Sequence, residues 1–229
     1  MQPHSQQTRR WFDARRALIW PHGQGATPSS PAPPPHPAFA PWLEHLTSQS
    51  LRPDDLDATF SLYRLHPPPP LPTDPRANFN DAVQLLDAAW LETAVAPGET
   101  AELLTFWRVT DPAKIGPIHP PADATDTVFF TQILRPEGTV LSQHDSLDAP
   151  SWAWQTGDIF AQIHSLPIPP DTPPGVYQII SGVYDRLTLE RLPTLDQNGQ
   201  PLDSFTPIQP SSSNKRFCHA EPYQFLPIR

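Results

Sequence analysis

The stretch TVFFTQILRPEGTVLSQ, residues 127–143, contains the pattern that decides the fold of this chain. A run rich in β-branched and aromatic residues, Thr127 to Leu134, is followed by the turn Pro136-Glu137-Gly138 and by a shorter run, Thr139 to Gln143. Runs of this length and composition are typical of strands, and a turn with Pro and Gly joins two of them into a hairpin. The stretch therefore predicts two neighbouring antiparallel strands.

The same pattern of strands and turns recurs through the second part of the chain. Six short strands with no helical stretch between them predict an antiparallel β-sandwich. Because neighbours such as Phe106 and Trp107 point to opposite faces of a strand, we expect one sheet face to dock on the N-terminal segment. The other strands are expected at Val83 to Leu86, Glu102 to Val109, Ile159 to Leu166 and Val176 to Asp185. The other turns are expected at Ala96-Pro97-Gly98, Thr156-Gly157-Asp158, Pro173-Pro174-Gly175 and Gln197-Asn198-Gly199.

Proline clusters at residues 28–41 and 67–75 divide the chain, because proline has no backbone donor for a ladder. In the first part, we expect a strand at Arg16 to Trp20, a helix at Pro41 to Ser48 and a strand at Ala58 to Leu65. The predicted fold is therefore mainly β: an immunoglobulin-like antiparallel β-sandwich preceded by a small partial α/β segment. The predicted divisions are this segment with its Pro-rich loop (1–66), a polyproline linker (67–78), the sandwich (79–207) and a C-terminal tail (208–229).

Composition excludes several classes of function. The 229 residues include 34 Pro and one cysteine, Cys218, which excludes an internal disulfide and a cysteine-based zinc cluster. Residues 79–229 carry 8 basic and 18 acidic side chains, so we expect no nucleic-acid partner. The longest early apolar run, Ala17 to Trp20, is too short for a signal peptide or a spanning helix.

No residue pattern in the chain predicts catalysis, a metal or a cofactor. Asp55-Leu56-Asp57 has the Asp-x-Asp form of metal-dependent glycosyltransferases, but it opens a turn ahead of a strand. His144-Asp145-Ser146 holds three catalytic residue types, but neighbours on a strand point to opposite faces. Asp196-Gln197-Asn198-Gly199 lacks the later acidic ligand of a calcium loop and predicts a hairpin turn. No two of the nine histidines have the spacing of a helical metal pair.

Two tryptophans are the candidates for glycan contact. Trp152 and Trp154, at i and i+2, place two indoles on one side of an extended segment, and such rings stack on sugars. The alternative interpretation is that one or both rings fill the core of the sandwich.

Three stretches carry a resemblance to a known family: Arg10 to Pro21, Trp154 to Phe160 and Leu166 to Asp185. They resemble the soluble C-terminal extracytoplasmic region of bacterial protein mannosyltransferase-like membrane glycosyltransferases. The resemblance implies a sandwich with a Trp-x-x-Gly-(Asp/Glu) turn and a Pro-Pro-Gly-x-Tyr hairpin. It also implies that the catalytic acid and the lipid-phosphate sugar donor belong to a membrane part that this chain lacks, so no catalytic residue is carried over. We expect the sequence upstream of Met1 to encode that part.

These observations predict a non-catalytic extracytoplasmic accessory domain of a membrane glycosyltransferase, which orients glycan or acceptor. Its expected partners are the membrane-embedded portion of that enzyme and a glycan or acceptor protein, at the extracytoplasmic face of the membrane. The alternative is a free-standing surface or secreted sandwich that binds carbohydrate or protein. A third hypothesis is a soluble metal-dependent glycosyltransferase that uses Asp55 and Asp57.

Overall fold

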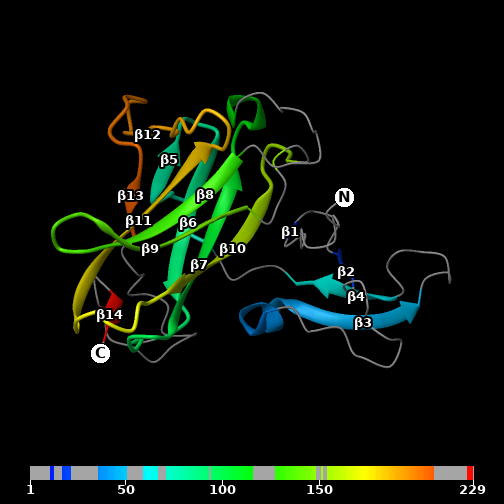
Figure 1. Ribbon diagram of the computed structural model, residues 1–229. Coiled ribbons are helices and arrows are strands. Elements are labelled where there is room, and N and C mark those ends of the chain that lie inside the picture. Colours follow the sequence, from blue (N-terminus) through cyan, green and yellow to red (C-terminus); the bar gives the residue numbers. More distant parts are fainter. Residues whose placement is uncertain are drawn as a thin grey trace.

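Strands dominate the protein, as the sequence predicts. The computed structural model describes residues 11–12, 17–21, 36–50, 59–66, 71–92, 94–115, 127–147, 151, 154–208 and 226–228 (Figure 1). The strands are β1 (Trp11–Phe12), β2 (Ala17–Pro21), β3 (Leu43–Ser50), β4 (Thr59–Leu65), β5 (Ala77–Phe79), β6 (Val83–Trp90), β7 (Thr100–Val109), β8 (Thr127–Leu134), β9 (Val140–Ser146), β10 (Ile159–Pro167), β11 (Gly175–Asp185), β12 (Thr194–Leu195), β13 (Thr206–Pro207) and β14 (Leu226–Ile228). The two short 3₁₀ helices are η1 (Pro37–Trp42) and η2 (Pro112–Ile115).

Two antiparallel sheets pack face to face and form the expected sandwich. The larger sheet has the strand order β1-β10-β7-β6-β5-β12, and the smaller one has the order β13-β11-β8-β9, with β14 also paired to β11. Four glycines in the predicted turns, at positions 98, 138, 157 and 199, have positive φ angles of 76° to 93°, which L side chains rarely adopt. These turn positions therefore require glycine, and they set where the strands begin and end.

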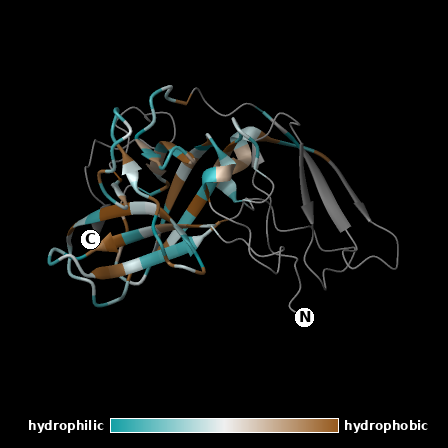
Figure 2. Ribbon diagram, turned by 90° about the horizontal axis from the view of Figure 1, so that it is seen from above, coloured by the Kyte–Doolittle hydropathy of each residue, from teal (hydrophilic) through white to brown (hydrophobic). Residues whose placement is uncertain are grey.

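The inner core lies between the two sheets and is built around aromatic rings. Trp107 of β7 lies 4.4 Å from Phe129 of β8, and Phe129 lies 5.6 Å from Phe160 of β10, measured between ring centroids. All three rings are at most 2% exposed. Apolar residues alternate with polar ones along several of these strands (Figure 2). Alternate residues of β7 and β10 belong to the inner core and to the cluster on the outer side, since successive side chains of a strand point to opposite faces.

The outer side of the larger sheet is covered by residues 36–42, which we call the η1 strap. Phe39 and Trp42 of the strap are 3% and 5% exposed, and the Trp42 ring lies 5.5 Å from that of Phe106. At the start of the strap, His36 Nε2 lies 2.9 Å from Glu102 Oε2. The expectation that one sheet face docks on the N-terminal segment is confirmed. The buried members of this outer cluster are Phe39, Trp42, Leu86, Leu104, Phe106, Ala161 and Ile163.

The helix expected at Pro41 to Ser48 is wrong. The chain makes the short η1 turn and then enters β3, which pairs with β4 from Leu43 opposite Leu65 to Ser50 opposite Thr59. Pro41 lies within η1, and Leu43 already has extended angles of φ −118° and ψ 119°. Pairing with β4 gives β3 a ladder of backbone hydrogen bonds along its length. This pairing outweighs the helical spacing of the few apolar residues in the segment. The three-stranded β2-β4-β3 sheet is therefore antiparallel, and β3 and β4 lie beside the sandwich (Figure 1).

Two further strands border the sandwich where the sequence predicts none. β1 pairs with β10 through Trp11 opposite Phe160, so the N-terminal segment supplies an edge of the larger sheet. β14 lies in the tail and pairs with β11. β1 and the η1 strap precede the predicted linker at residues 67–78, and both contact the sandwich that follows it. The division of the chain at this linker stays a prediction.

Tyr177 closes the turn that leads into β11. The hairpin that the resemblance implies is not formed there, because β10 and β11 belong to different sheets. The Tyr177 hydroxyl donates a hydrogen bond of 2.7 Å to the backbone carbonyl of Pro173, four residues earlier. The residue is 5% exposed, so the phenol is almost removed from water. This arrangement resembles the tyrosine corner of immunoglobulin-like sandwiches, in which a tyrosine near the start of a strand bonds to backbone just upstream.

We predict that Tyr177→Phe lowers the free energy of unfolding by about 1 kcal/mol, because it leaves a carbonyl in a tight turn without its donor. Urea denaturation of the full chain measures this change. Tyr184→Phe is the matched control, since the Tyr184 hydroxyl bonds at 3.2 Å near the surface and its loss changes stability less. Equal effects of both substitutions would contradict the assigned role.

The second prediction concerns the η1 strap. Trp42→Ala removes the largest ring over the outer cluster, and we expect it to lower the free energy of unfolding by about 3 kcal/mol. The substitution Leu46→Ala is the control, because Leu46 is 42% exposed. If Trp42→Ala and Leu46→Ala melt at the same temperature, the strap does not contribute to the stability of the sandwich.

Candidate functional site

The structure places only one of the two candidate tryptophans. Trp154 is 6% exposed, its ring is stacked on that of Phe160 at 5.1 Å, and it meets Phe129 edge-on at 6.1 Å. This is the position that the alternative, core packing, predicts for Trp154. Such a ring has no open face for a sugar. Trp152 lies outside the described residues, so its contact with a glycan stays a prediction.

The other motifs of the sequence do not form a reaction centre in the described residues. His144 and Asp145 lie on opposite faces of β9, as expected: His144 opposes the inward-facing Thr131, and Asp145 accepts a hydrogen bond from the Tyr184 hydroxyl on the outer side. Asp196 accepts bonds from the backbone amides of Asn198 and Gln200, which confirms a hairpin turn there. Asp55 and Asp57 lie outside the described residues.

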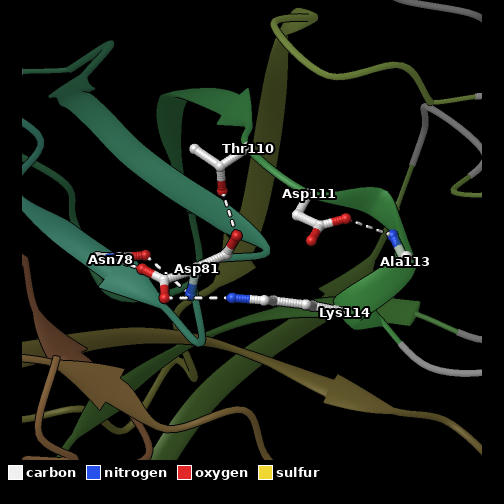
Figure 3. Close-up of polar contacts among 6 residues, drawn as sticks. All are labelled: Asn78, Asp81, Thr110, Asp111, Ala113 and Lys114. Atoms are coloured by element: carbon white, nitrogen blue, oxygen red, sulfur yellow. Dashed lines mark hydrogen bonds and ion pairs between the residues drawn. The ribbon is translucent and has the colours of Figure 1, made fainter.

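Exposed acidic side chains near the β5–β6 turn form hydrogen bonds that stabilise the local fold (Figure 3). Asp81 accepts hydrogen bonds from Asn78 Nδ2 at 2.7 Å and from Lys114 Nζ at 3.2 Å. The hydrogen bond from Asn78, and then that from Lys114, lower the pKa of Asp81. Asp111 accepts a bond from the amide of Ala113 at the start of η2. Within the described ranges, no group of three or more His, Cys, Asp or Glu side chains could hold a metal ion.

The outer side of β8, β9 and β11 carries several polar side chains, next to positions that are covered: Phe130 and Ile180 on the same side are 1% and 4% exposed. Gln132 and Gln143 are direct partners across β8 and β9, and Gln132 Nε2 donates to Gln143 Oε1 at 3.3 Å. Gln178 stands exposed on β11, one row away. We call the outward polar set Gln132, Gln143, Asp145, Gln178 and Tyr184 the amide face. The η1 strap covers the corresponding side of the larger sheet, so the two outer surfaces differ.

Tyr184 and Asp145 lie at one end of the amide face. The hydroxyl of Tyr184 on β11 reaches Asp145 Oδ2 on β9 at 3.2 Å, across the intervening strand β8. Burial, and then the charge of Asp145, raise the pKa of the Tyr184 phenol, so the group stays protonated and donates. The guanidinium of Arg191 lies 4.3 Å from the ring centroid of Phe130, next to Tyr184. The face therefore presents fixed donors and acceptors on rigid strands.

A second polar feature lies inside the sandwich, and we call it the polar seam. Trp107 Nε1 donates to Thr105 Oγ1 at 2.8 Å, and Ser181 Oγ donates to the carbonyl of Phe130 at 2.9 Å. These hydrogen bonds satisfy the buried polar side chains of the seam on β7 and β11. The seam consists of the inward side chains of Thr105, Thr131, Ser142, His144, Gln162, His164 and Ser181.

His164 is the titratable group that burial alters most among the described residues. Its side chain is entirely buried, and desolvation, followed by the charge of His144, lowers its pKa to about 3. The imidazole is therefore neutral in the folded protein at any pH near neutrality.

This gives a third prediction, on pH. The unfolded chain takes up a proton at His164 below pH 6.5, whereas the folded chain does so only near pH 3. The contribution of His164 to stability is complete above pH 6.5 and is lost as the pH falls from there toward 3, by about 2 kcal/mol at pH 5. Urea denaturation at pH 7.5 and pH 5 should show less pH dependence in His164→Leu than in the wild type. An unchanged dependence in His164→Leu, matching that of the exposed control His66→Gln, would contradict the prediction.

Comparisons with known proteins give no family. No protein-family model matches the sequence, and no curated protein matches it. A solved structure described as the crystal structure of the C-terminal domain of wzt is 14% identical, covers 62% of this chain and 75% of that chain, and has a TM-score of 0.34. A TM-score of this size does not establish a shared fold. None of these comparisons supports the resemblance to mannosyltransferase-like enzymes. No helix among the described residues is long and apolar enough to cross a bilayer.

Sequence reasoning missed the amide face and the seam. The signal for the face was present, since Gln132, Gln143 and Gln178 occupy outward positions of predicted strands. The seam left no local signal, because His144 and His164 come from strands of different sheets.

Proposed function

We propose that this chain is a non-catalytic extracytoplasmic accessory domain of a membrane glycosyltransferase that holds a glycan, or a glycosylated acceptor, on the amide face. The observation that carries the proposal is the pair of planar amide side chains on the outer side of β8 and β9, Gln132 and Gln143, which lie in direct register. Amide and carboxylate groups fixed on strands suit the neighbouring hydroxyls of a sugar ring, since each group can donate to or accept from two of them.

The chemistry of the face supports binding rather than reaction. Asp145 is exposed and already accepts from Tyr184, whose phenol stays protonated. Neither group is set beside a nucleophile in the part of the chain that the structure describes. A half-exposed tyrosine adds apolar contact for the ring of a sugar and keeps its hydroxyl available. We therefore expect the isolated chain to bind glycan without transferring or hydrolysing it.

The link to a membrane enzyme depends on the sequence resemblance. Two of its motifs occupy turns of the sandwich: Gly157 lies in the turn before β10, and Pro173 to Tyr177 lead into β11. In the family that the chain resembles, such a sandwich follows the membrane-embedded catalytic part. The chain would then lie at the extracytoplasmic surface and present the glycan or acceptor to that part.

A free-standing binding protein is the second candidate, and one observation favours a protein partner for it. The turn after β11 exposes Leu187 by 51% and Leu189 by 70%, and Leu189 has a positive φ of 60°. A leucine that is both exposed and held in the left-handed region is unfavourable on two counts, which suits a contact site.

A glycan array with the full chain tests the proposed function. We expect Gln143→Ala and Asp145→Ala each to weaken glycan binding at least about fivefold, with little change in melting temperature, because both side chains are exposed contacts. The matched control is Gln197→Ala, an exposed glutamine in the hairpin turn away from the face. Absence of glycan binding, or equal binding by all three variants, would refute a glycan function for the amide face. Binding of an acceptor protein lost on Leu189→Gly would instead support the second candidate.

A further inference from the structure

One end of the amide face carries amide and apolar side chains together, on the β8–β9 hairpin and the adjoining part of β11. Gln132 of β8 lies opposite Gln143 of β9. In the next row of the same face, Leu134 of β8 lies between Val140 of β9 and Gln178 of β11. The two rows are about 7 Å apart, because every second residue of a strand points to one face. We call these five residues the mixed patch.

The mixed patch is accessible, although the face next to it is covered. Gln143 and Gln178 are exposed, and Val140 is 41% exposed. Ile180, the neighbour of Gln132 on β11, is only 4% exposed. The β8–β9 hairpin projects from one side of the sandwich (Figure 1). A ligand can therefore contact amide and apolar side chains at this end of the face.

Hydrogen bonds of the hairpin fix the backbone beneath the patch. Arg135 Nη1 donates to the carbonyl oxygen of Val140 at 2.7 Å, and the backbone amide of Arg135 donates to the carbonyl oxygen of Thr139 at 2.8 Å. Gly138 supplies the positive φ of 86° that the turn needs. Val140 is therefore held in place before any ligand binds, so little entropy is lost in ordering it.

The glutamine pair leaves one donor group and one acceptor group for a ligand. Gln132 Nε2 donates to Gln143 Oε1 at 3.3 Å, and within the described ranges Gln132 Oε1 and Gln143 Nε2 have no other partner. If both side-chain amides are turned over, one N–H group and one C=O group still remain. A secondary amide has one group of each kind, so it matches the pair.

Val140 adds an apolar contact beside this pair. Its methyl groups lie one row from the two glutamines, and Leu134 lies next to it in that row. A methyl group attached to a secondary amide is the N-acetyl substituent of an amino sugar. A hydroxyl in the same place has no methyl group to pack against Val140. Asp145, the next outward residue of β9, repels acidic sugars, so the face suits neutral ones.

We propose that the mixed patch recognises the N-acetyl group of an amino sugar. Gln132 and Gln143 bond to its amide, and Val140 packs against its methyl group. Gln178 lies two strand spacings, about 10 Å, from Val140 and contacts a neighbouring sugar of the same glycan. This inference rests on the proposed glycan function and narrows its ligands to glycans that contain N-acetylated sugars.

Calorimetric titration of the full chain with chitotetraose and with cellotetraose tests this inference. The two tetrasaccharides have the same linkage and ring configuration, and they differ only in carrying an N-acetyl group or a hydroxyl beside the linked carbon. We expect chitotetraose to bind at least about tenfold more tightly, since cellotetraose lacks both the amide and the methyl group.

Val140→Thr is the variant that tests the methyl contact. It replaces one methyl group with a hydroxyl and keeps the β-branched shape that suits a strand, so the melting temperature should stay the same. We expect the affinity for chitotetraose to fall about fourfold and the affinity for cellotetraose to stay unchanged. Leu202→Thr is the matched control, because Leu202 is 69% exposed and lies between β12 and β13, outside the patch.

The outcomes separate this inference from the proposed function. Equal affinities for the two tetrasaccharides, or an affinity ratio that Val140→Thr leaves unchanged, would overturn the inference and leave a glycan function in place. Binding of other glycans on the array, but of neither tetrasaccharide, would do the same. If no glycan binds, the proposed function is refuted as well. Displacement of chitotetraose by an equal concentration of an N-acetylated alanine peptide would assign the patch to peptide amides and overturn the inference.

Discussion

Strand β7 is buried on both of its faces, and the arrangement of the protein follows from this constraint. Leu103 and Trp107 point into the inner core, whereas Leu104 and Phe106 point outward. A strand that is apolar on both sides needs cover on both sides. The smaller sheet supplies one cover, and the η1 strap supplies the other. The outer side of the smaller sheet carries the polar side chains of the amide face, next to the buried Phe130 and Ile180.

Strand β9 connects the amide face with the polar seam. One of its sides carries Gln143 and Asp145, and the other carries His144 against His164. Because successive side chains of a strand are fixed relative to one another, a change in the seam moves the outer side chains as well. Sites built on strands hold their geometry better than sites on loops. The geometry of the amide face therefore depends on how the inward side chains of β9 pack in the seam.

The features of the fold that local sequence patterns encode could be predicted, and those set by contacts between distant segments could not. The strand Thr127 to Leu134 was predicted with its observed limits, and the glycine turns were found, because alternation and turn chemistry are local. The helix at Pro41 to Ser48 was wrong because a ladder with β4 decides that segment, and the partner is not visible in a short window. The same limit hides that Trp154 enters the core and that His144 and His164 meet. These outcomes depend on tertiary contacts.

The pairing of β1 with β10 has a consequence for synthesis of the chain. Trp11 pairs with Phe160, so the edge of the larger sheet needs two segments that leave the ribosome far apart in time. At about 5–20 residues per second, the N-terminal strand waits about 7 to 30 s for its partner. Pairing across so long a loop also makes folding slow once both strands are present. The η1 strap waits less long, because the Leu86, Leu104 and Phe106 side chains that it covers lie on β6 and β7, which are synthesised before β10.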